Sequence, residues 1–307
     1  MYTYLLSIKK VVLGLIFFAS GIGIIFAQDS IPAPEKKKPL ERKPFESGIA
    51  INEQTVEIPP AKTLEFVLQH RFGTIQNGWS DLAGIWGASN IRLGLNFSIT
   101  KNFLIGLGTS KNNRLQDLQW KYTFLHQRKG GFPLTIAYYG NLALNATNKS
   151  NFGIEYKFID RLSWFHQILV ARRFCKMFSM QLGFSYSHYN KVDSTSKNDA
   201  FSISVLGRIK VSPQTSVLIA YQQPFVVNYD PAFIIRYPNK WMSCSANSFP
   251  YPDVELGVEI STSTHSFHIF IASAQGIVPQ QIVQYNNNNF WNGGILIGLN
   301  ITRLWGF

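Results

Sequence analysis

The chain has 307 residues, a formal net charge of +12, and 46% hydrophobic and 14% aromatic residues. After residue 27 no apolar run approaches the roughly 18 residues that a membrane-spanning helix requires, which excludes a helical bundle in a membrane. The basic residues do not gather on one face. Composition therefore argues against nucleic-acid binding and favours contact with anionic lipid headgroups.

The first 27 residues have the pattern of a secretory signal peptide. Lys9 and Lys10 precede an apolar stretch over residues 11–26, and Ala27 is the expected last residue before cleavage. An uncleaved membrane anchor remains the alternative. Residues 28–61 hold six prolines and a basic run, so we expect an extended, mostly unstructured periplasmic arm. The barrel mouth is a candidate docking place for this arm, with residues 45–51 as a candidate short strand.

From Thr63 onward, apolar and polar residues alternate in segments that are separated by turn residues, which is typical of strands with one apolar face. Each segment is close to the roughly 9–11 residues that a tilted strand needs to cross a bilayer. The twelve predicted strands cover residues 63–72, 91–100, 102–109, 115–126, 134–144, 162–173, 178–189, 200–210, 216–222, 253–263, 266–274 and 293–307. Residues 162–173 are apolar on both faces, so the pattern does not fix which face points inward.

Short and long connectors alternate along these segments, as in outer-membrane barrels with short periplasmic turns and long external loops. Both ends of the barrel domain, residues 62–307, then fall on the periplasmic side. The last strand ends on the aromatic Phe307, and we expect it to close the cylinder and to be recognised by the barrel-assembly machinery. The fold class predicted is all-β: a transmembrane, antiparallel, up-and-down β-barrel of about 12 strands in the Gram-negative outer membrane.

Several segments resemble those of a known family. They cover residues 63–73, 81–87, 90–94, 165–172, 210–215 and 295–307. Together they resemble an uncharacterised β-barrel family of Bacteroidetes-type bacteria, known as a domain of unknown function. The resemblance implies a barrel and an outer-membrane location, and it supplies no catalytic or binding residues.

Charged residues on the predicted inner faces give the main functional hint, because buried charges are costly unless they are paired or hydrated. Two interpretations stay open. The charges pair across strands and stiffen a narrow barrel, which we favour, or they line a water-filled passage and set its solute preference. The candidate lumen-lining residues are Glu65, Arg71, Arg92, Asp117, Lys121, Arg208, Glu255 and Glu259.

The connector over residues 73–90 is compact and apolar at its centre. It contains Asp81, Gly84, Trp86 and Gly87. We hypothesise that it folds into the lumen as a constriction.

Signals for catalysis are weak. No histidine is followed by serine two positions later, the spacing that barrel phospholipases use, and adjacent Ser187 and His188 point to opposite faces of a strand. Cys175 and Cys244 are placed at opposite rims, too far apart for a disulfide. We therefore expect no enzyme, no cofactor and no metal site.

Two functions follow from these patterns. The leading one is a narrow passive channel, or transport-associated porin, for small polar solutes. The alternative is a non-conducting structural or adhesive barrel whose long loops, notably residues 224–252 and 285–291, bind external partners.

Overall fold

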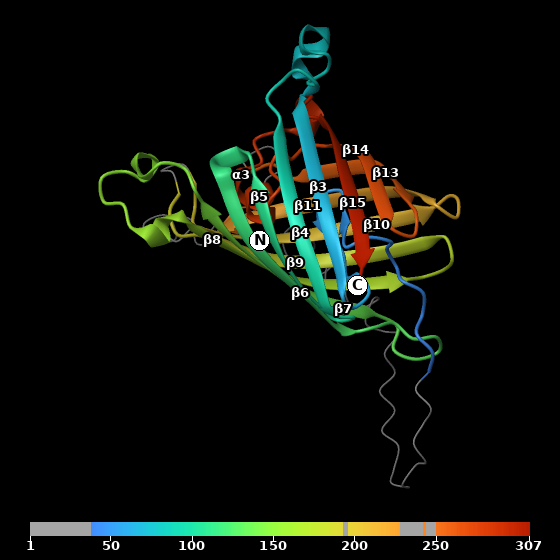
Figure 1. Ribbon diagram of the computed structural model, residues 1–307. Coiled ribbons are helices and arrows are strands. Elements are labelled where there is room, and N and C mark those ends of the chain that lie inside the picture. Colours follow the sequence, from blue (N-terminus) through green and yellow to red (C-terminus); the bar gives the residue numbers. More distant parts are fainter. Residues whose placement is uncertain (1–37, 193–195, 228–241, 244–249) are drawn as a thin grey trace, which may run out of the picture. The chain divides into compact units, whose positions relative to one another are not determined.

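The computed structural model describes residues 38–192, 196–227, 242–243 and 250–307. The predicted signal peptide, the first part of the arm and Cys244 lie outside the described residues. Within the described part, twelve antiparallel strands follow one another around a closed cylinder, and the last pairs with the first (Figure 1). They are β3 (Thr63–Thr74), β4 (Asn90–Thr100), β5 (Phe103–Ser110), β6 (Leu115–Leu125), β7 (Thr135–Asn145), β8 (Leu162–Arg173), β9 (Phe178–Tyr189), β10 (Asp199–Lys210), β11 (Thr215–Val227), β13 (Asp253–Ser261), β14 (His265–Ala272) and β15 (Leu296–Gly306).

The predicted fold class is thus confirmed, and most strand ends lie within a few residues of the predicted ones. The largest difference is β11, which continues to Val227 and pairs there with the short strand β12 (Met242–Ser243). In the closing pair Gly306 lies opposite Thr63 and Asn300 opposite Gln69. Connectors alternate in length as predicted except after β5 and β6, where residues 111–114 are fewer than residues 126–134. The barrel thus has a short-turn end and a long-loop end.

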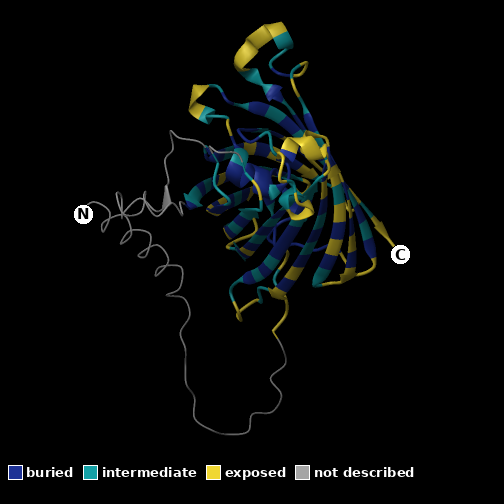
Figure 2. Ribbon diagram, turned by 90° about the vertical axis from the view of Figure 1, so that its left-hand side faces the viewer, coloured by how far each residue is buried: buried dark blue, intermediate teal, exposed yellow. Residues whose placement is uncertain are grey.

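Side chains alternate between the two faces of the wall, as Figure 2 shows by its bands of buried and exposed residues. Along β4, the outward side chains of Leu93, Leu95, Phe97 and Ile99 are 40–52% exposed, whereas Asn96 and Ser98 between them are buried. A contiguous apolar band of this kind is unfavourable in water and suits contact with acyl chains.

The described part of the arm enters the cylinder. A hairpin of β1 (Ile49–Ala50) and β2 (Glu53–Gln54) lies inside the wall. Residues 45–58, which we call the plug, are almost entirely buried, with Phe45 1% and Ile51 0% exposed. The expectation of an unstructured arm is wrong for these residues, because apolar partners on the wall compensate the entropy of ordering them.

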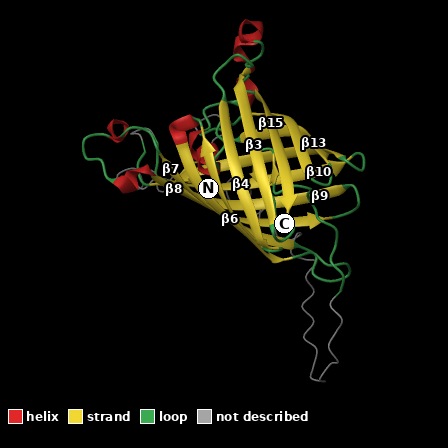
Figure 3. Cartoon of the chain, in the orientation of Figure 1, coloured by secondary structure: helices red, strands yellow, loops and turns green. Residues whose placement is uncertain are grey.

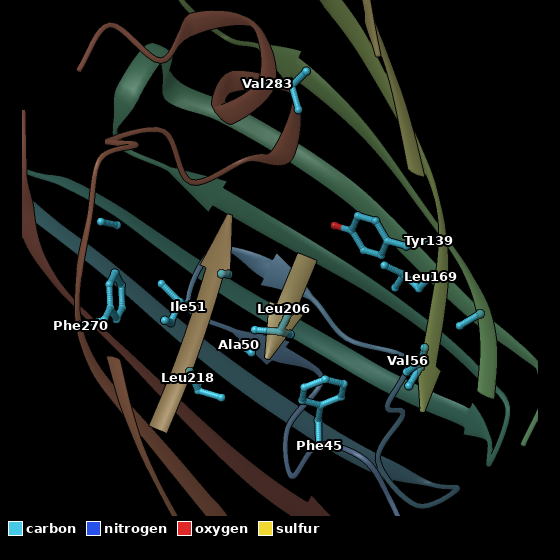
Figure 4. Packing of buried hydrophobic residues seen from close by; sticks show 14 of the residues in the cluster. Phe45, Ala50, Ile51, Val56, Tyr139, Leu169, Leu206, Leu218, Phe270 and Val283 are labelled. Atoms are coloured by element: carbon cyan, nitrogen blue, oxygen red, sulfur yellow. The ribbon is translucent and has the colours of Figure 1, made fainter. Parts of the chain in front are cut away.

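These apolar partners explain the two apolar faces of β8. Phe165 and Leu169 point inward and join Phe45 and Ile51 of the plug in one buried cluster, part of which is labelled in Figure 4. Burial of one such side chain contributes about 1.5–3 kcal/mol. The barrel interior therefore has an apolar core as well as a polar lining.

Helices occur in the connectors of the long-loop end (Figure 3). The helix α3 (Pro279–Tyr285) lies between β14 and β15 in sequence and contacts β8, β9, β10 and β11. Short 3-10 helices complete these connectors: η1 (Ile75–Asp81), η2 (Asn112–Arg114), η3 (Lys149–Phe152), η4 (Phe158–Arg161) and η5 (Phe290–Asn292). No helix within the described ranges has the length and apolar character to cross a membrane.

Candidate functional site

The tip of the plug is held by Arg71 of β3. This guanidinium is fully buried; its Nε and Nη2 donate to Asn52 Oδ1 at 3.0 and 2.6 Å, and its Nη1 donates to Asn300 Oδ1 at 2.8 Å. Asn300 Nδ2 donates in turn to the carbonyl of Ile51 at 2.7 Å. The Phe270 ring lies 4.6 Å from the guanidinium carbon. Hydrogen bonds and a ring face thus stabilise this buried cation without a direct carboxylate partner.

Ile51 itself is conformationally strained. Its φ of 58° lies in the left-handed region, which β-branched residues rarely adopt. Such a conformation costs about 1–3 kcal/mol and persists where the surroundings enforce it. The contacts of the docked plug therefore hold Ile51 in a backbone conformation that the free chain disfavours.

An acidic cluster on β13 faces the other side of the tip. Asn52 Nδ2 donates to Asp253 Oδ2 at 2.7 Å, and its backbone N donates to Glu255 Oε2 at 3.2 Å. Glu53 of the plug accepts from Ser204 Oγ at 2.9 Å. Burial, together with the nearby Asp253 carboxylate, raises the pKa of Glu53 from 4.5 to about 7, against the opposing effect of the Ser204 hydrogen bond.

Near the short-turn end the plug is held by Lys121. Its Nζ donates to the carbonyl of Gly48 at 2.7 Å and to that of Glu57 at 3.4 Å. Burial raises the pKa of the Glu57 carboxyl to about 7, although the charges of Lys43 and Lys121 act in the opposite direction.

Wall side chains also satisfy the backbone of the plug. Gln181 donates to the carbonyl of Gln54 at 2.7 Å and accepts from the backbone N of Val56 at 3.0 Å. Thr123 Oγ1 donates to the carbonyl of Val56 at 2.9 Å. A short hairpin inside a barrel cannot pair all of its backbone groups with itself, so the polar wall supplies the partners.

Two ion pairs lie on the wall. Arg92 Nε and Nη2 donate to Asp117 Oδ1 and Oδ2 at 2.8 and 2.6 Å, a bidentate arrangement. Arg208 Nε donates to Glu259 Oε2 at 2.9 Å, and its Nη2 donates to Glu46 Oε1, also at 2.9 Å. The second pair therefore links β10, β13 and the first turn of the plug.

All eight charged residues singled out from the sequence have inward, buried side chains, none more than 5% exposed. The structure brings Arg92 to Asp117 and Arg208 to Glu259, and it joins Arg71 and Glu255 through Asn52 of the plug. Their role as the lining of a passage stays a prediction. Sequence reasoning missed the plug partners of Arg71, Lys121 and Arg208, which are Asn52, Gly48 and Glu46.

The connector over residues 75–89 does not enter the interior, which corrects the expected constriction. It folds back on itself beyond β3 and β4, where Gly84 O accepts from the backbone N of Gly73 and Asp81 Oδ1 accepts from that of Gly84. Trp86 is 72% exposed, and Gly87 is partly exposed beside it. Tight backbone packing of Gly84 on Gly73 gives the connector a compact fold of its own, so it needs no contact with the lumen.

The segment that does enter from the long-loop end is α3. Gln280 Nε2 donates to Asn141 Oδ1 at 3.0 Å, and Gln284 Nε2 donates to Ser187 Oγ at 3.0 Å. Val283 is 1% exposed and joins the apolar cluster of the plug (Figure 4). The sequence signal was weak, because a helix of seven residues is too short for a periodic pattern.

Little space remains beside the plug. A cavity of about 20 Å³ lies between Gly48, Glu65, Arg92 and Tyr139, which is room for about one water molecule. Larger cavities open at the two ends: about 440 Å³ at the long-loop end and about 460 Å³ at the short-turn end. Plug and α3 thus separate two polar vestibules.

Within the described ranges, no group of three His, Cys, Asp or Glu residues is arranged to hold a metal ion. Cys175 is an exposed free thiol in the turn after β8. The other predicted free thiol, Cys244, lies outside the described residues.

Closed pairing, an apolar outer band and a polar, occupied interior define a membrane β-barrel with an internal plug. The family model described as "Membrane bound beta barrel domain (DUF5777)" matches residues 45–305, so the chain belongs to that family. The match confirms the resemblance to a barrel family of unknown function; the bacterial group stays a prediction. It begins at Phe45, so it includes the plug.

Among solved structures, the NanC porin is 8% identical, with 80% of this chain and 99% of NanC covered at a TM-score of 0.46. The KdgM porin is 7% identical; the match covers 78% of this chain and 98% of KdgM, with a TM-score of 0.42. The Omp33 outer membrane protein of Acinetobacter baumannii is 9% identical; the match covers 82% of this chain and 100% of Omp33, with a TM-score of 0.39. A comparison with curated proteins finds no match.

Proposed function

We propose that this protein is an outer-membrane channel for small polar solutes, closed in the described conformation by residues 45–58 and by α3. The long-loop end faces the exterior in this proposal, and the short-turn end faces the periplasm. Outer-membrane lipid surrounds the wall, and the assembly machinery reads the C-terminal strand ending at Phe307. The role involves no catalysis and no nucleic acid.

One observation carries the proposal: the axis of the barrel is occupied by separable segments that pack against inward side chains of the wall. Eight strands make a cylinder that side chains can fill, whereas sixteen or more leave an aqueous channel. Twelve strands lie between these cases, and here the axis is occupied by the plug hairpin and α3. Removal of the plug would leave the polar lining of the wall facing water, together with inward apolar side chains such as Phe165 and Leu169.

The contacts of the plug suit reversible docking. Hydrogen bonds from Arg71, Lys121 and Gln181 can be replaced by water at modest net cost, about 0.5–1.5 kcal/mol for a neutral pair and 1.5–3 for a charged one. The strained φ of Ile51 relaxes when the tip is released. Both features reduce the free-energy difference between the docked and the undocked state.

Planar bilayer recordings test this proposal. Full-length protein should give rare or brief openings. A variant in which residues 45–58 are replaced by a Gly/Ser linker of equal length should give sustained conductance steps. A variant with the 75–89 connector shortened is the matched control and should behave as the full-length chain. A heat-dependent shift on a detergent gel establishes that each variant forms the barrel. If the plug-less barrel is silent, residues 279–285 are replaced by a second linker, and silence of that folded barrel would reject the channel.

A non-conducting barrel that binds external partners is the second candidate. Its support is an aromatic patch at the long-loop end, where Trp79, Trp86 and Trp291 are 86%, 72% and 77% exposed. Gln76 Nε2 donates to the carbonyl of Asn292 at 3.4 Å and so joins the two connectors that carry them. Exposed tryptophans of this kind are typical of binding surfaces.

A further inference from the structure

The vestibule at the long-loop end has an unusual lining. Its volume is about 440 Å³, and nine of its twenty lining residues are Asn or Gln. An amide side chain both donates and accepts hydrogen bonds, and so does a hydroxyl group. A surface of this composition is complementary to a ligand with many hydroxyls. Its charged members are Arg161, Lys191 and Asp160, so its formal charge is only slightly positive.

The charged residues of the vestibule are already engaged by the protein. Arg161 donates to the carbonyls of Asn145 and Thr147 at 2.7 and 2.6 Å and to the hydroxyl of Tyr156 at 2.6 Å. Lys191 lies 3.7 Å from Asp160. An anionic ligand would have to compete with these partners. A neutral ligand meets the side-chain amides of Asn113, Asn151 and Asn287, which make no hydrogen bond to another described residue.

A second observation points to a ligand. Gln281 of α3 lines the vestibule, is only 5% exposed, and has a buried Oε1 with no hydrogen-bond partner among the described residues. A buried acceptor without a partner is unfavourable, and a donor from a bound molecule would supply the missing hydrogen bond. Aromatic rings complete the lining: Tyr189 and Tyr285 meet edge to face with centroids 5.1 Å apart. Ring faces of this kind can pack on the apolar C–H face of a pyranose.

We infer that this vestibule binds a neutral oligosaccharide, with Gln281 accepting a hydrogen bond from a sugar hydroxyl. The inference goes beyond the proposed channel, because a barrel that stays closed keeps the same vestibule.

The test uses the full-length protein in lipid nanodiscs and ligand-observed saturation-transfer NMR. The probes are maltotetraose, cellotetraose, xylotetraose and mannotetraose, with tetragalacturonate as the anionic comparison and empty nanodiscs as background. At least one neutral probe should receive saturation from aromatic protons. Gln281→Leu should weaken its binding about five- to tenfold, the equivalent of one lost hydrogen bond.

Gln214→Ala is the matched control, because this exposed glutamine lies in a turn of the short-turn end and should leave binding unchanged. If Gln281→Leu fails to fold, the double variant Asn112→Ala/Asn287→Ala, with both changes in connectors that line the vestibule, takes its place. The inference is overturned if no neutral tetrasaccharide binds, if tetragalacturonate binds more tightly than all of them, or if folded vestibule variants bind as the original chain does.

Discussion

Asn52 joins the plug to three buried charged residues of the wall, Arg71, Asp253 and Glu255, so Asn52→Ala is a direct test of docking. The substitution removes two hydrogen bonds from Arg71 and one to Asp253, and both partners are almost fully buried. Each hydrogen bond to a charged group is worth about 1.5–3 kcal/mol, so two charged partners left unsatisfied cost about 3–6 kcal/mol in the docked state.

The undocked state does not bear this cost, because water then solvates Arg71 and Asp253. The docking equilibrium should therefore shift toward release by roughly 10²- to 10⁴-fold. The wall keeps its strand pairing and its apolar outer band, so the barrel itself should remain folded.

Hydrogen–deuterium exchange of the nanodisc-embedded protein measures this shift. Peptides that cover residues 45–58 should exchange much faster in Asn52→Ala, while peptides from β3 to β15 keep their protection. The control is Asn148→Ala, an exposed asparagine in the connector after β7. Unchanged protection of residues 45–58 would show that Asn52 does not hold the plug. Equal loss of protection in the strands would show that plug and wall unfold as one unit, which would refute the idea of a separable plug.

Three further predictions concern pH, the wall and the connector. The docked plug binds extra protons because the pKa of both Glu53 and Glu57 rises from 4.5 to about 7; docking should thus be strongest below pH 4.5 and weaken, by about 3 kcal/mol per group, as pH rises through 7. After correction for the intrinsic pH dependence of amide exchange, residues 45–58 should exchange more slowly at pH 5 than at pH 8. The double variant Glu53→Gln/Glu57→Gln should reduce this difference. Corrected exchange that slows as pH rises would contradict the predicted direction of the pH dependence. Asp117→Ala leaves the buried Arg92 cation unpaired and should lower the free energy of unfolding by about 3–5 kcal/mol, measured by urea titration in detergent; an unchanged midpoint would count against the pair. Shortening the 75–89 connector in the plug-less barrel should leave its conductance unchanged, and a change would mean that this connector reaches the pore.

The wall could be predicted from the sequence because its signal is local. In β3, every second residue from Thr63 onward is buried, and this alternation continues over twelve consecutive residues. Alternation with a period of two places successive side chains on opposite faces of the strand. The pattern also identified Arg92 and Asp117 as inward residues. It could not pair them, because their contact depends on how β4, β5 and β6 align across the sheet.

The sequence suggested that the arm docks at the barrel mouth and forms a short strand within residues 45–51, where β1 lies. The contacts of the plug could not be predicted, because its partners are remote in sequence. Asn52 binds Asp253, 201 residues away, and Val56 binds Gln181, 125 residues away. Prolines at both ends of the segment are typical of an extended linker, and only the spaced apolar residues Ile49, Ile51 and Val56 hinted at burial. The two apolar faces of β8 were the complementary sign, since an inward Phe165 requires an apolar partner inside the barrel.

The connections of the plug fix the direction in which it can leave. Its tip lies near the long-loop end, beside Arg71 and Asp253, but both of its stems emerge at the short-turn end. Ile58 is followed after four residues by the first residue of β3, and before the plug Glu41 donates its backbone N–H to the carbonyl of Gln127 in the turn after β6. A hairpin tethered on both sides at one rim can withdraw only through that rim. A pull on residues 38–44 from the short-turn side would therefore act along the axis of the hairpin and release Asn52 last. A ligand in the opposite vestibule, in contrast, can act on the plug only through α3 and the apolar cluster that α3 and the plug share.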